Sequence, residues 1–378
     1  VVVLSNNDGC VVARSPEAKA LDIRMAVPAY QIQDLIQREQ VAVFSSNYAL
    51  YADISNRVMT TLEDLAPAVE VYSIDEAFLD LKGLQTQDLD AYGQHIRQTI
   101  DRWVGVPVSI GIAPTKTLAK LANHAAKQFP RTQGVVDLRD PAWQHRLLDI
   151  MPVREVWGIG PRMEKHLEQM GIRTARELAE CDPGVMRRTF SVTIERTIRE
   201  LNGEACIGLE EEPAAKQQII CSRSFSQRIT CLQDMREAIS SYAVRAAEKL
   251  REENRYARIV TVFLRTNRFN PREPQYTPSA SIELPLPSSD SRDINEAALE
   301  LLQSIYRDGY RYMKAGVMLG EFYEPGVYQQ NLFDNGRERP RSKALMTTLD
   351  QINHSGLGSL FFASEGIRKD WAMKRAHL

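Results

Sequence analysis

The sequence predicts an α+β protein, and three stretches carry that prediction. Two apolar, β-prone runs within residues 69–81 flank an adjacent pair of acids, which is typical of a β-hairpin. A strand over Val106–Ile112 leads directly into a helix that starts near Thr115. Residues 217–322 show the order β-α-β-β-α-β, for which we expect helices on one face of an open sheet. We expect the strands of the first part of the chain to share one sheet.

The remaining elements follow from apolar periodicity and from turn residues. Apolar residues at helical spacing predict a helix over residues 51–65, and Thr230 with Gln233 fits a capping box at the start of a long helix. The other predicted elements are a strand over residues 1–4, helices near 17–21, 32–38 and 89–103, strands at about 256–266 and 276–284, a helix from about 293 and a strand that ends near 319.

Composition limits the class of protein. The 378 residues are 43% hydrophobic and 25% charged, which is ordinary for a soluble globular chain of two to four domains. A net charge of −2 excludes a uniformly basic nucleic-acid binder, so any such binding must come from local patches. The five cysteines are scattered and the histidines lack metal-ligand spacing, which indicates reduced thiols in the cytoplasm and argues against a zinc site or a disulfide framework.

The acids of the hairpin, Asp75 and Glu76, are candidates for a metal site. At or beside a tight turn, neighbouring side chains emerge at the same end of a sheet, whereas in a straight strand they point to opposite faces. Two carboxylates bounded by Ile74 and Phe78 form the hard-oxygen site that Mg²⁺ accepts, and such sites support two-metal phosphoryl or nucleotidyl transfer. The dipeptide alone is equally compatible with an ordinary polar turn.

A second candidate is a row of lysines. Lys116, Lys120 and Lys127 fall within about 40° of one another on a helix, because each residue advances by about 100°. The helix follows a strand of the same domain as the acids, and cations beside a metal site suit a triphosphate. Lys19 could add a further cation. The alternative is a solvated helix face.

Two further regions suit contact with a phosphate backbone. Gly158 and Gly160 precede an amphipathic helix, as in a helix-hairpin-helix whose turn offers backbone N–H groups to phosphate, and the alternative is a plain turn between helices. Basic residues also lie on or near the strands of residues 217–322, although a solvated surface would look the same. The candidate DNA-binding residues are Gly158, Gly160, Arg162, Lys165, Arg223, Arg228, Arg265 and Lys314.

Four of these features occur together along the chain: Ser73–Phe78, Ile110–Ile112 with its lysine helix, Trp157–Gly160, and the β-α-β-β-α-β unit. In this combination they resemble the Y-family (translesion) DNA polymerases over essentially the whole chain. Three further stretches resemble the UmuC branch of that family, the catalytic subunits of bacterial DNA polymerase V and their plasmid-borne relatives. These stretches are Leu4–Cys10, Phe44–Tyr51 and Ile220–Phe225.

The resemblance implies a right-hand polymerase architecture and an error-prone, template-directed DNA polymerase for translesion synthesis in the SOS response. The implied parts are palm and fingers in residues 1–152, a helix-hairpin-helix thumb in 153–212, a linker at 213–216, a little finger in 217–322 and a C-terminal tail in 323–378. The family's first strand, with a further metal-binding Asp and the aromatic residue that excludes ribonucleotides, would precede residue 1. We therefore expect this chain to be an inactive fragment of a longer, active protein.

The resemblance also implies roles for particular residues. Asp75 resembles the carboxylate that bridges two Mg²⁺ ions with bound dNTP, and Glu76 resembles the one that serves the ion activating the primer 3′-hydroxyl. Lys19 and Lys127 match positions that grip the incoming triphosphate. Gln329, Leu332 and Phe333 lie in a stretch that resembles a sliding-clamp-binding peptide but could also pack on its own chain. The implied partners are primer–template DNA, a UmuD′-type dimer, a RecA filament and the sliding clamp.

Two other classes of protein remain open on the residues. One is a catalytically inactive, polymerase-like module that binds primer–template DNA and the clamp. Clustered acids disfavour it, because carboxylates near DNA repel phosphates unless metal is bound. The other is a nucleotidyl cyclase or nuclease with a palm-type sheet. The thumb-like and little-finger-like regions disfavour it, since a small-substrate enzyme needs no DNA-tracking surface.

Overall fold

The computed structural model describes residues 1–84, 88–210, 215–325, 327, 339, 341–356 and 358–377. The chain divides into two compact units. The first combines Val1–Asn47 with Ala215–Leu378, and the second is Tyr48–Ala214. The fold is α+β, as the sequence predicts.

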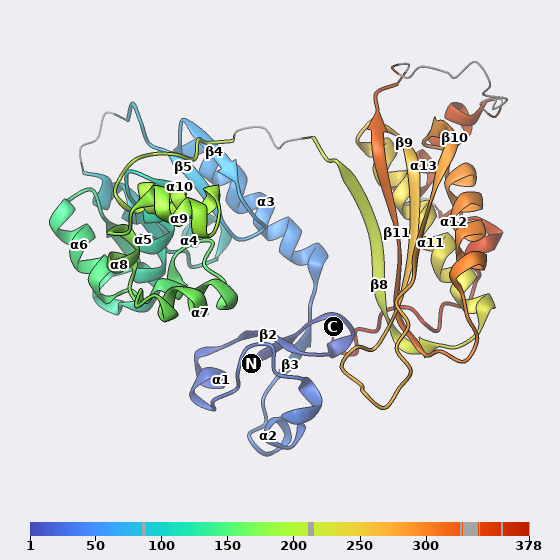
Figure 1. Ribbon diagram of the computed structural model, residues 1–378, viewed down its shortest axis with the longest axis horizontal. Helices are drawn as coiled ribbons and strands as arrows, with labels where there is room; N and C mark the ends of the chain where they lie inside the picture. Colours follow the sequence, from blue (N-terminus) through green and yellow to red (C-terminus); the bar gives the residue numbers. More distant parts are fainter. Residues whose placement is uncertain are drawn as a thin grey trace. The chain divides into compact units, whose positions relative to one another are not determined.

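The main feature of the first unit is an antiparallel sheet of four strands in the order β10-β9-β11-β8 (Figure 1). Its helices α11 and α12 cover one face, and alternate residues of each strand are buried beneath them. The sequence order β-α-β-β-α-β is confirmed. Its elements are β8 (Gln218–Ile229), α11 (Leu232–Glu252), β9 (Tyr256–Thr266), β10 (Ser279–Ser288), α12 (Ser291–Ile305) and β11 (Tyr312–Tyr323).

The predicted capping box at the start of α11 is wrong. The residue before the helix is Cys231, and it makes no side-chain cap. The Gln233 side chain donates instead to Glu237, at 3.0 Å, and the Thr230 carbonyl accepts from the Tyr306 hydroxyl, also at 3.0 Å. The helix starts one residue later than the motif requires, with Cys231 as its N-cap.

The chain's first residues form a smaller sheet in the same unit. Strand β1 (Val2–Leu4) pairs with β2 (Val11–Arg14) antiparallel and with β3 (Val43–Ser45) parallel. Its buried side chains pack with the residues around two short helices, α1 (Pro16–Ala20) and α2 (Gln33–Arg38). These helices and β1 match the sequence prediction.

The C-terminal residues pack onto both sheets of this unit. Helix α13 (Ser342–His354) is fixed to α11 by a bidentate ion pair, in which Arg251 donates to both oxygens of Asp350 at 2.7 Å. Further along, Trp371 is buried against Phe225 and Tyr242. The carbonyl of His377 accepts from the Ser45 N–H of β3 at 2.9 Å, and its N–H donates to the Ser45 hydroxyl at 3.0 Å. Much of the predicted tail is therefore a folded part of the unit.

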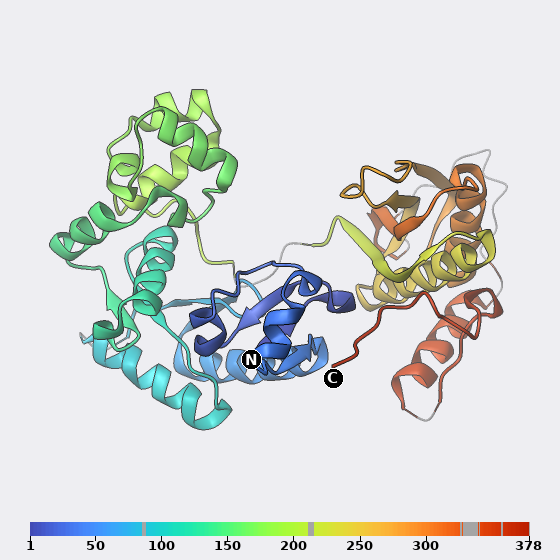
Figure 2. The same cartoon turned by 90° about the horizontal axis from the view of Figure 1, so that it is seen from below.

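The second unit is mainly helical, and its last four helices, green in Figure 2, share one apolar core with residues of α5 and α6. Its elements are α3 (Tyr48–Leu65), β4 (Ala68–Val71), β5 (Ala77–Asp80), α4 (Leu89–Val104), β6 (Ile110–Ile112), α5 (Lys116–Gln128), β7 (Val135–Asp137), α6 (Pro141–Ile150), α7 (Pro161–Gln169), α8 (Ala175–Ala179), α9 (Pro183–Thr189) and α10 (Val192–Leu201).

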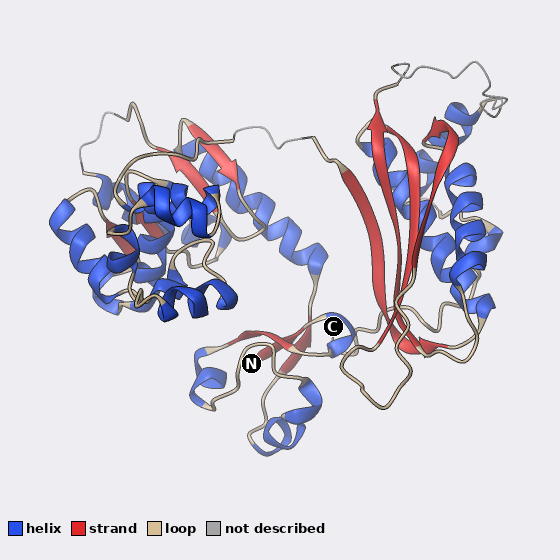
Figure 3. Ribbon diagram, viewed as in Figure 1, coloured by secondary structure: helices blue, strands red, loops and turns tan. Residues whose placement is uncertain are grey.

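The expectation of one sheet in the first part of the chain is wrong. In the described residues the strands before α6 form three ladders, β2-β1-β3, β4-β5 and β6-β7, whose short strands are red in Figure 3. Each strand has only three or four residues. Each can therefore form only a few backbone hydrogen bonds with a strand of another ladder. Residues of β4, β5 and β6 nevertheless share one apolar core with α3 and α4. Packing rather than a continuous ladder joins them.

Two predictions from composition can be checked against this fold. The five cysteines are all free thiols. Among the described helices, none is long and apolar enough to cross a bilayer.

Candidate active site and nucleic-acid interface

The predicted hairpin is present, and its acids lie at the end of a five-residue loop. Val71 pairs with Ala77, and the backbone N–H groups of Tyr72 and Ser73 both donate to the Glu76 carbonyl, at 3.1 and 3.0 Å. These bonds close the loop immediately before β5. The connection is longer than a two-residue turn, and it brings both acids to one end of the β4-β5 ladder.

The two acids have different surroundings. Asp75 is exposed, and its Oδ1 accepts a hydrogen bond from the Ser73 hydroxyl at 2.7 Å. Within the described part of the chain, its Oδ2 accepts none. Glu76 is half-buried, and its Oε2 lies 2.9 Å from the ammonium group of Lys120. One carboxylate therefore faces solvent while the other is held by a cation.

Lys120 is also fixed by aromatic rings. Its ammonium lies 4.7 Å from the ring centre of Tyr72 and 5.5 Å from that of Trp157. The Trp157 indole donates to the Tyr72 hydroxyl at 3.2 Å, and both rings pack edge-on at 5.5 Å. A lysine held by two ring faces and a carboxylate has few alternative rotamers. Sequence reasoning missed this role of Trp157 and Tyr72, although both belong to motifs singled out for other reasons.

The other two lysines of the predicted row differ from Lys120. Lys116 is buried, forms an ion pair with Glu70 and lies over the Phe78 ring. It is therefore a structural cation and is not available to a triphosphate, contrary to the expectation of one lysine face. Lys127 is exposed. The acids that neutralise this helix come from β4 and the hairpin loop, and are distant in sequence.

A small cavity of about 140 Å³ joins these groups. Glu76 of the hairpin loop and Lys127 of α5 both line it. The cavity is lined by Glu76, Lys120, Asn123, His124, Lys127, Glu155 and Trp157. Among these residues, Nδ1 of His124 lies 3.5 Å from Oε2 of Glu155. Lys19, the other lysine expected at a triphosphate, belongs to the first unit and is not placed relative to this cavity.

A fully buried acid, Glu200, fixes the start of the lysine helix. Its Oε2 accepts from the backbone N–H and the hydroxyl of Thr117, at 2.9 and 2.7 Å, and its Oε1 accepts from the N–H groups of Cys206 and Ile207. Carboxylates that accept several hydrogen bonds at a helix N-terminus are stabilising. Glu200 thereby links α10 to α5, a role that no local sequence pattern indicated.

The Gly158–Gly160 turn has the geometry of a helix start that is open to a ligand. Gly158 has a φ of +90°, which favours glycine, and Gly160 precedes α7 without a side-chain cap. The first N–H groups of α7 are therefore free of a capping side chain. Arg162 and Lys165 are both exposed on this helix. These features suit a phosphate, as the sequence predicts for a helix-hairpin-helix.

The uncovered face of the four-stranded sheet carries basic side chains near one end. Lys314 pairs directly with Arg265 on one neighbouring strand and with Ser224 on the other, so the three share a face. Arg265 is exposed and lies 5.3 Å from the ring centre of Phe263, on the same face two residues away. This face is positive at the end that carries Lys314 and Arg265, and the Phe263 ring lies over Gly316.

The other two basic candidates of this unit lie differently. Arg223 alternates to the face of Cys221 and Phe225, which are buried under the helices, although its own side chain is exposed. Arg228 is half-buried, one residue before the buried Ile229. Gln329, Leu332 and Phe333, the predicted clamp-binding residues, lie outside the described residues.

Comparison with known proteins accounts for almost all of the chain. A model of the impB/mucB/samB family matches residues 1–124, and a model of that family's C-terminal domain matches residues 216–332. Protein UmuC of Salmonella typhimurium (strain LT2) is 53% identical, over all of this chain and 90% of the relative. This chain belongs to the impB/mucB/samB family. It is a UmuC-type Y-family DNA polymerase, which carries out translesion synthesis in error-prone damage bypass.

More distant relatives of this family member agree. DNA polymerase IV of Desulfatibacillum aliphaticivorans is 28% identical over 92% of this chain and 85% of the relative. A chimeric Y-family DNA polymerase built from Dbh and Dpo4 matches the fold with a TM-score of 0.64, at 21% identity, over 86% of this chain and 92% of the other. The fold is thus that of Y-family polymerases. Residues 343–378 match a domain of unknown function, DUF4113.

Proposed function

We propose that Asp75 and Glu76 are the catalytic carboxylates of this polymerase and that they hold two Mg²⁺ ions with the bound dNTP. The donor set fits, since both acids lie at one loop end and Asp75 has an oxygen directed to solvent. When bound, such ions stabilise the attacking and leaving oxygens of nucleotidyl transfer. This arrangement is the observation that carries the proposal.

The neighbouring residues would position the substrates. Lys127, exposed on the cavity that Glu76 lines, supplies a cation for the triphosphate, and Lys19 would add a second. Lys120 holds Glu76 at the hairpin, and a metal bound by Glu76 would compete with this ion pair. Much of the rate would then come from positioning and from charge.

Two surfaces would hold primer–template DNA. In the second unit, the start of α7 with Gly158, Gly160, Arg162 and Lys165 suits a backbone phosphate. In the first unit, the open sheet face with Arg265 and Lys314, and Arg228 near the end of β8, suits contact with phosphates without base readout. Accordingly, residues 1–152 serve as palm and fingers, 153–212 as thumb and 217–322 as little finger, with 213–216 as linker and 323–378 as tail.

The resemblance to UmuC extends the proposal to partners and location. It gives a cytoplasmic polymerase that works with a UmuD′-type dimer, a RecA filament and the sliding clamp. The clamp would be contacted through Gln329, Leu332 and Phe333.

The test is primer extension opposite an abasic site with Mg²⁺, dNTPs and accessory subunits, comparing the native residue with Asp75→Ala. We expect extension to fall by at least about 10³-fold, the scale on which removing a catalytic group acts, with primer–template affinity retained. Asp64→Ala, which removes an exposed acid from α3, is the matched control and should leave extension unchanged.

Two outcomes would count against the assignment. Extension that survives Asp75→Ala would place the catalytic acids elsewhere. DNA binding without any extension by the native protein would favour the inactive DNA-binding module.

A further inference from the structure

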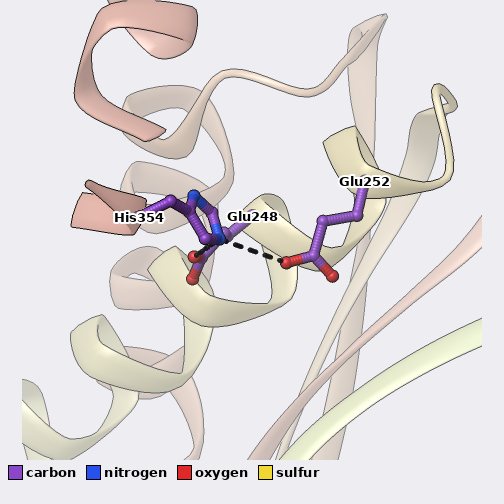
Figure 4. Close-up of side chains that lie close together, drawn as sticks. All are labelled: Glu248, Glu252 and His354. Atoms are coloured by element: carbon purple, nitrogen blue, oxygen red, sulfur yellow. Dashed lines mark ion pairs between the residues drawn. The ribbon is translucent and has the colours of Figure 1, made fainter. Parts of the chain in front are cut away.

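A cluster of metal-ligand side chains in the first unit has no part in the proposed polymerase chemistry. Glu248 and Glu252 lie one turn apart on α11, and His354 is the last residue of α13 (Figure 4). One ligand atom from each lies within 4.8 Å of the other two. The histidine faces both carboxylates, and the three side chains come from two helices that are distant in sequence.

The hydrogen bonding of His354 decides which ring nitrogen faces the acids. Its Nδ1 lies 2.7 Å from the carbonyl oxygen of Asp350. A carbonyl only accepts, so Nδ1 carries the hydrogen and Nε2 is left to face Glu248 and Glu252. Metal-binding histidines are commonly oriented by a hydrogen bond of this kind from the other nitrogen to a backbone carbonyl.

The distances in the cluster are longer than hydrogen bonds. Nε2 of His354 lies 3.5 Å from Glu248 Oε1 and 3.9 Å from Glu252 Oε1. Good hydrogen bonds between nitrogen and oxygen span about 2.7–3.2 Å. Two ligands bound at about 2.0–2.2 Å to a tetrahedral ion are separated by about 3.3–3.6 Å. The two separations from Nε2, 3.5 and 3.9 Å, are therefore close to that of ligands around one ion.

Arg245 completes the surroundings. It forms an ion pair with Glu248 through Oε2, which leaves Oε1 of Glu248 toward the histidine. Its Nη1 also lies 3.8 Å from Glu252 Oε1. When the His354 ring is neutral, Nε2 carries a lone pair, and the three ligand atoms are then all acceptors that repel one another. One arginine offsets only part of the charge of two carboxylates, so a cation between them is favourable.

We propose that Glu248, Glu252 and His354 bind a divalent transition-metal ion of the zinc type and that this ion clamps α13 onto α11. A nitrogen and two carboxylate oxygens form a donor set that such ions accept, with water in a fourth position. The third ligand comes from the segment matched by the domain of unknown function, so the ion would strengthen the docking that the Arg251–Asp350 pair begins.

The first test is calorimetric titration of the metal-free full chain with Zn²⁺, in excess Mg²⁺ so that all-oxygen sites are occupied. We expect one Zn²⁺ site, weakened at least about tenfold by His354→Ala and by Glu252→Gln. His145→Ala, which removes an exposed histidine from α6, is the matched control and should change nothing. Co²⁺ in place of Zn²⁺ should give the visible absorption of a tetrahedral site in the native chain but not in His354→Ala.

The second test asks whether the ion holds α13. Zn²⁺ should slow proteolytic release of the C-terminal segment that carries α13 from the native chain and have no such effect on His354→Ala. Equal Zn²⁺ affinity in the native chain and both variants, or no binding below about 1 mM, would overturn the site. Should His354→Ala fail to fold, Glu252→Gln decides, because it keeps the size of the side chain and removes only the charge.

Discussion

At the scale of single residues, the hairpin depends on Lys120. Its ammonium group forms an ion pair with Glu76 and lies over the ring faces of Tyr72 and Trp157. Lys120 therefore connects the lysine helix to the hairpin loop and to the turn before α7. An ion pair of this exposure contributes at most about 1 kcal/mol, and each cation–π contact adds about 0.5–1 kcal/mol. The contribution is modest for stability, but orientation of Glu76 depends on it.

We expect Lys120→Ala to lower the rate of nucleotide incorporation roughly tenfold, because about 1.4 kcal/mol of lost orientation in the transition state corresponds to that factor. The affinity for primer–template DNA should not change. Single-turnover incorporation kinetics measure the rate, and fluorescence anisotropy measures DNA binding. Lys82→Ala, which removes an exposed lysine just after β5, is the control. An unchanged rate in Lys120→Ala would show that Glu76 needs no such support.

At the scale of elements, one buried acid joins α12 to α13. Asp290 precedes α12 and accepts from the Arg292 N–H at 2.8 Å, from its guanidinium, and from the Ser342 hydroxyl at 2.5 Å. Burial alone would raise the pKa of this carboxyl. The hydrogen bonds from Arg292 and Ser342 outweigh burial and hold the pKa below its ordinary value of 3.8. The charged form of Asp290 is therefore more stable in the folded protein than in the unfolded chain.

Asp290→Ala should lower the free energy of unfolding by about 1 kcal/mol at pH 7, as loss of a helix cap does. A depressed folded-state pKa stabilises the fold above the unfolded value, and this contribution disappears as the pH falls from 3.8 toward the folded-state pKa. Urea unfolding at pH 7 and at pH values below 3.8 measures the difference. Glu300→Ala, on the exposed part of α12, is the control. A difference that is independent of pH would contradict the argument.

At the scale of the whole molecule, binding to DNA must come from local charge. The net charge is −2, yet Arg265 and Lys314 lie side by side on an uncovered sheet face. Glycine is required at position 316 of this face, since a Cβ there would meet the Ser222 Cβ at 2.4 Å and the Phe263 ring at 2.5 Å. A locally positive face suits backbone contact without sequence readout.

Replacing both Arg265 and Lys314 by alanine should reduce the salt dependence of DNA affinity. The slope of log K against log salt should fall by about 0.9 for each phosphate that the variant no longer neutralises. Arg223→Ala is the matched comparison and should leave the slope unchanged, because its strand position is on the helix-covered face. Binding titrations at several salt concentrations measure the slopes. If Arg223→Ala lowered the slope as much as the double variant, DNA binding could not be assigned to the uncovered sheet face.

Local patterns in the sequence were enough to predict most elements. Apolar runs between turn residues predicted the strands of the β-α-β-β-α-β unit, and apolar residues at helical spacing predicted α3 and α11, because a helix buries one face. The acid pair and its hairpin were also predicted, since the signal lies within thirteen residues. The capping box at Thr230 was wrong, because the helix begins after Cys231, one residue later than the motif requires.

The sequence by itself determined the α+β fold class, the family resemblance and the position of Asp75 and Glu76 at a hairpin end. Only the tertiary structure decided that Lys116 is a buried structural cation, that Glu200 anchors α5, and that His354 meets two glutamates of α11. Each of these depends on a partner more than 40 residues away. Spacing along a chain reports neighbours within one element, whereas a long-range contact depends on how separate elements pack.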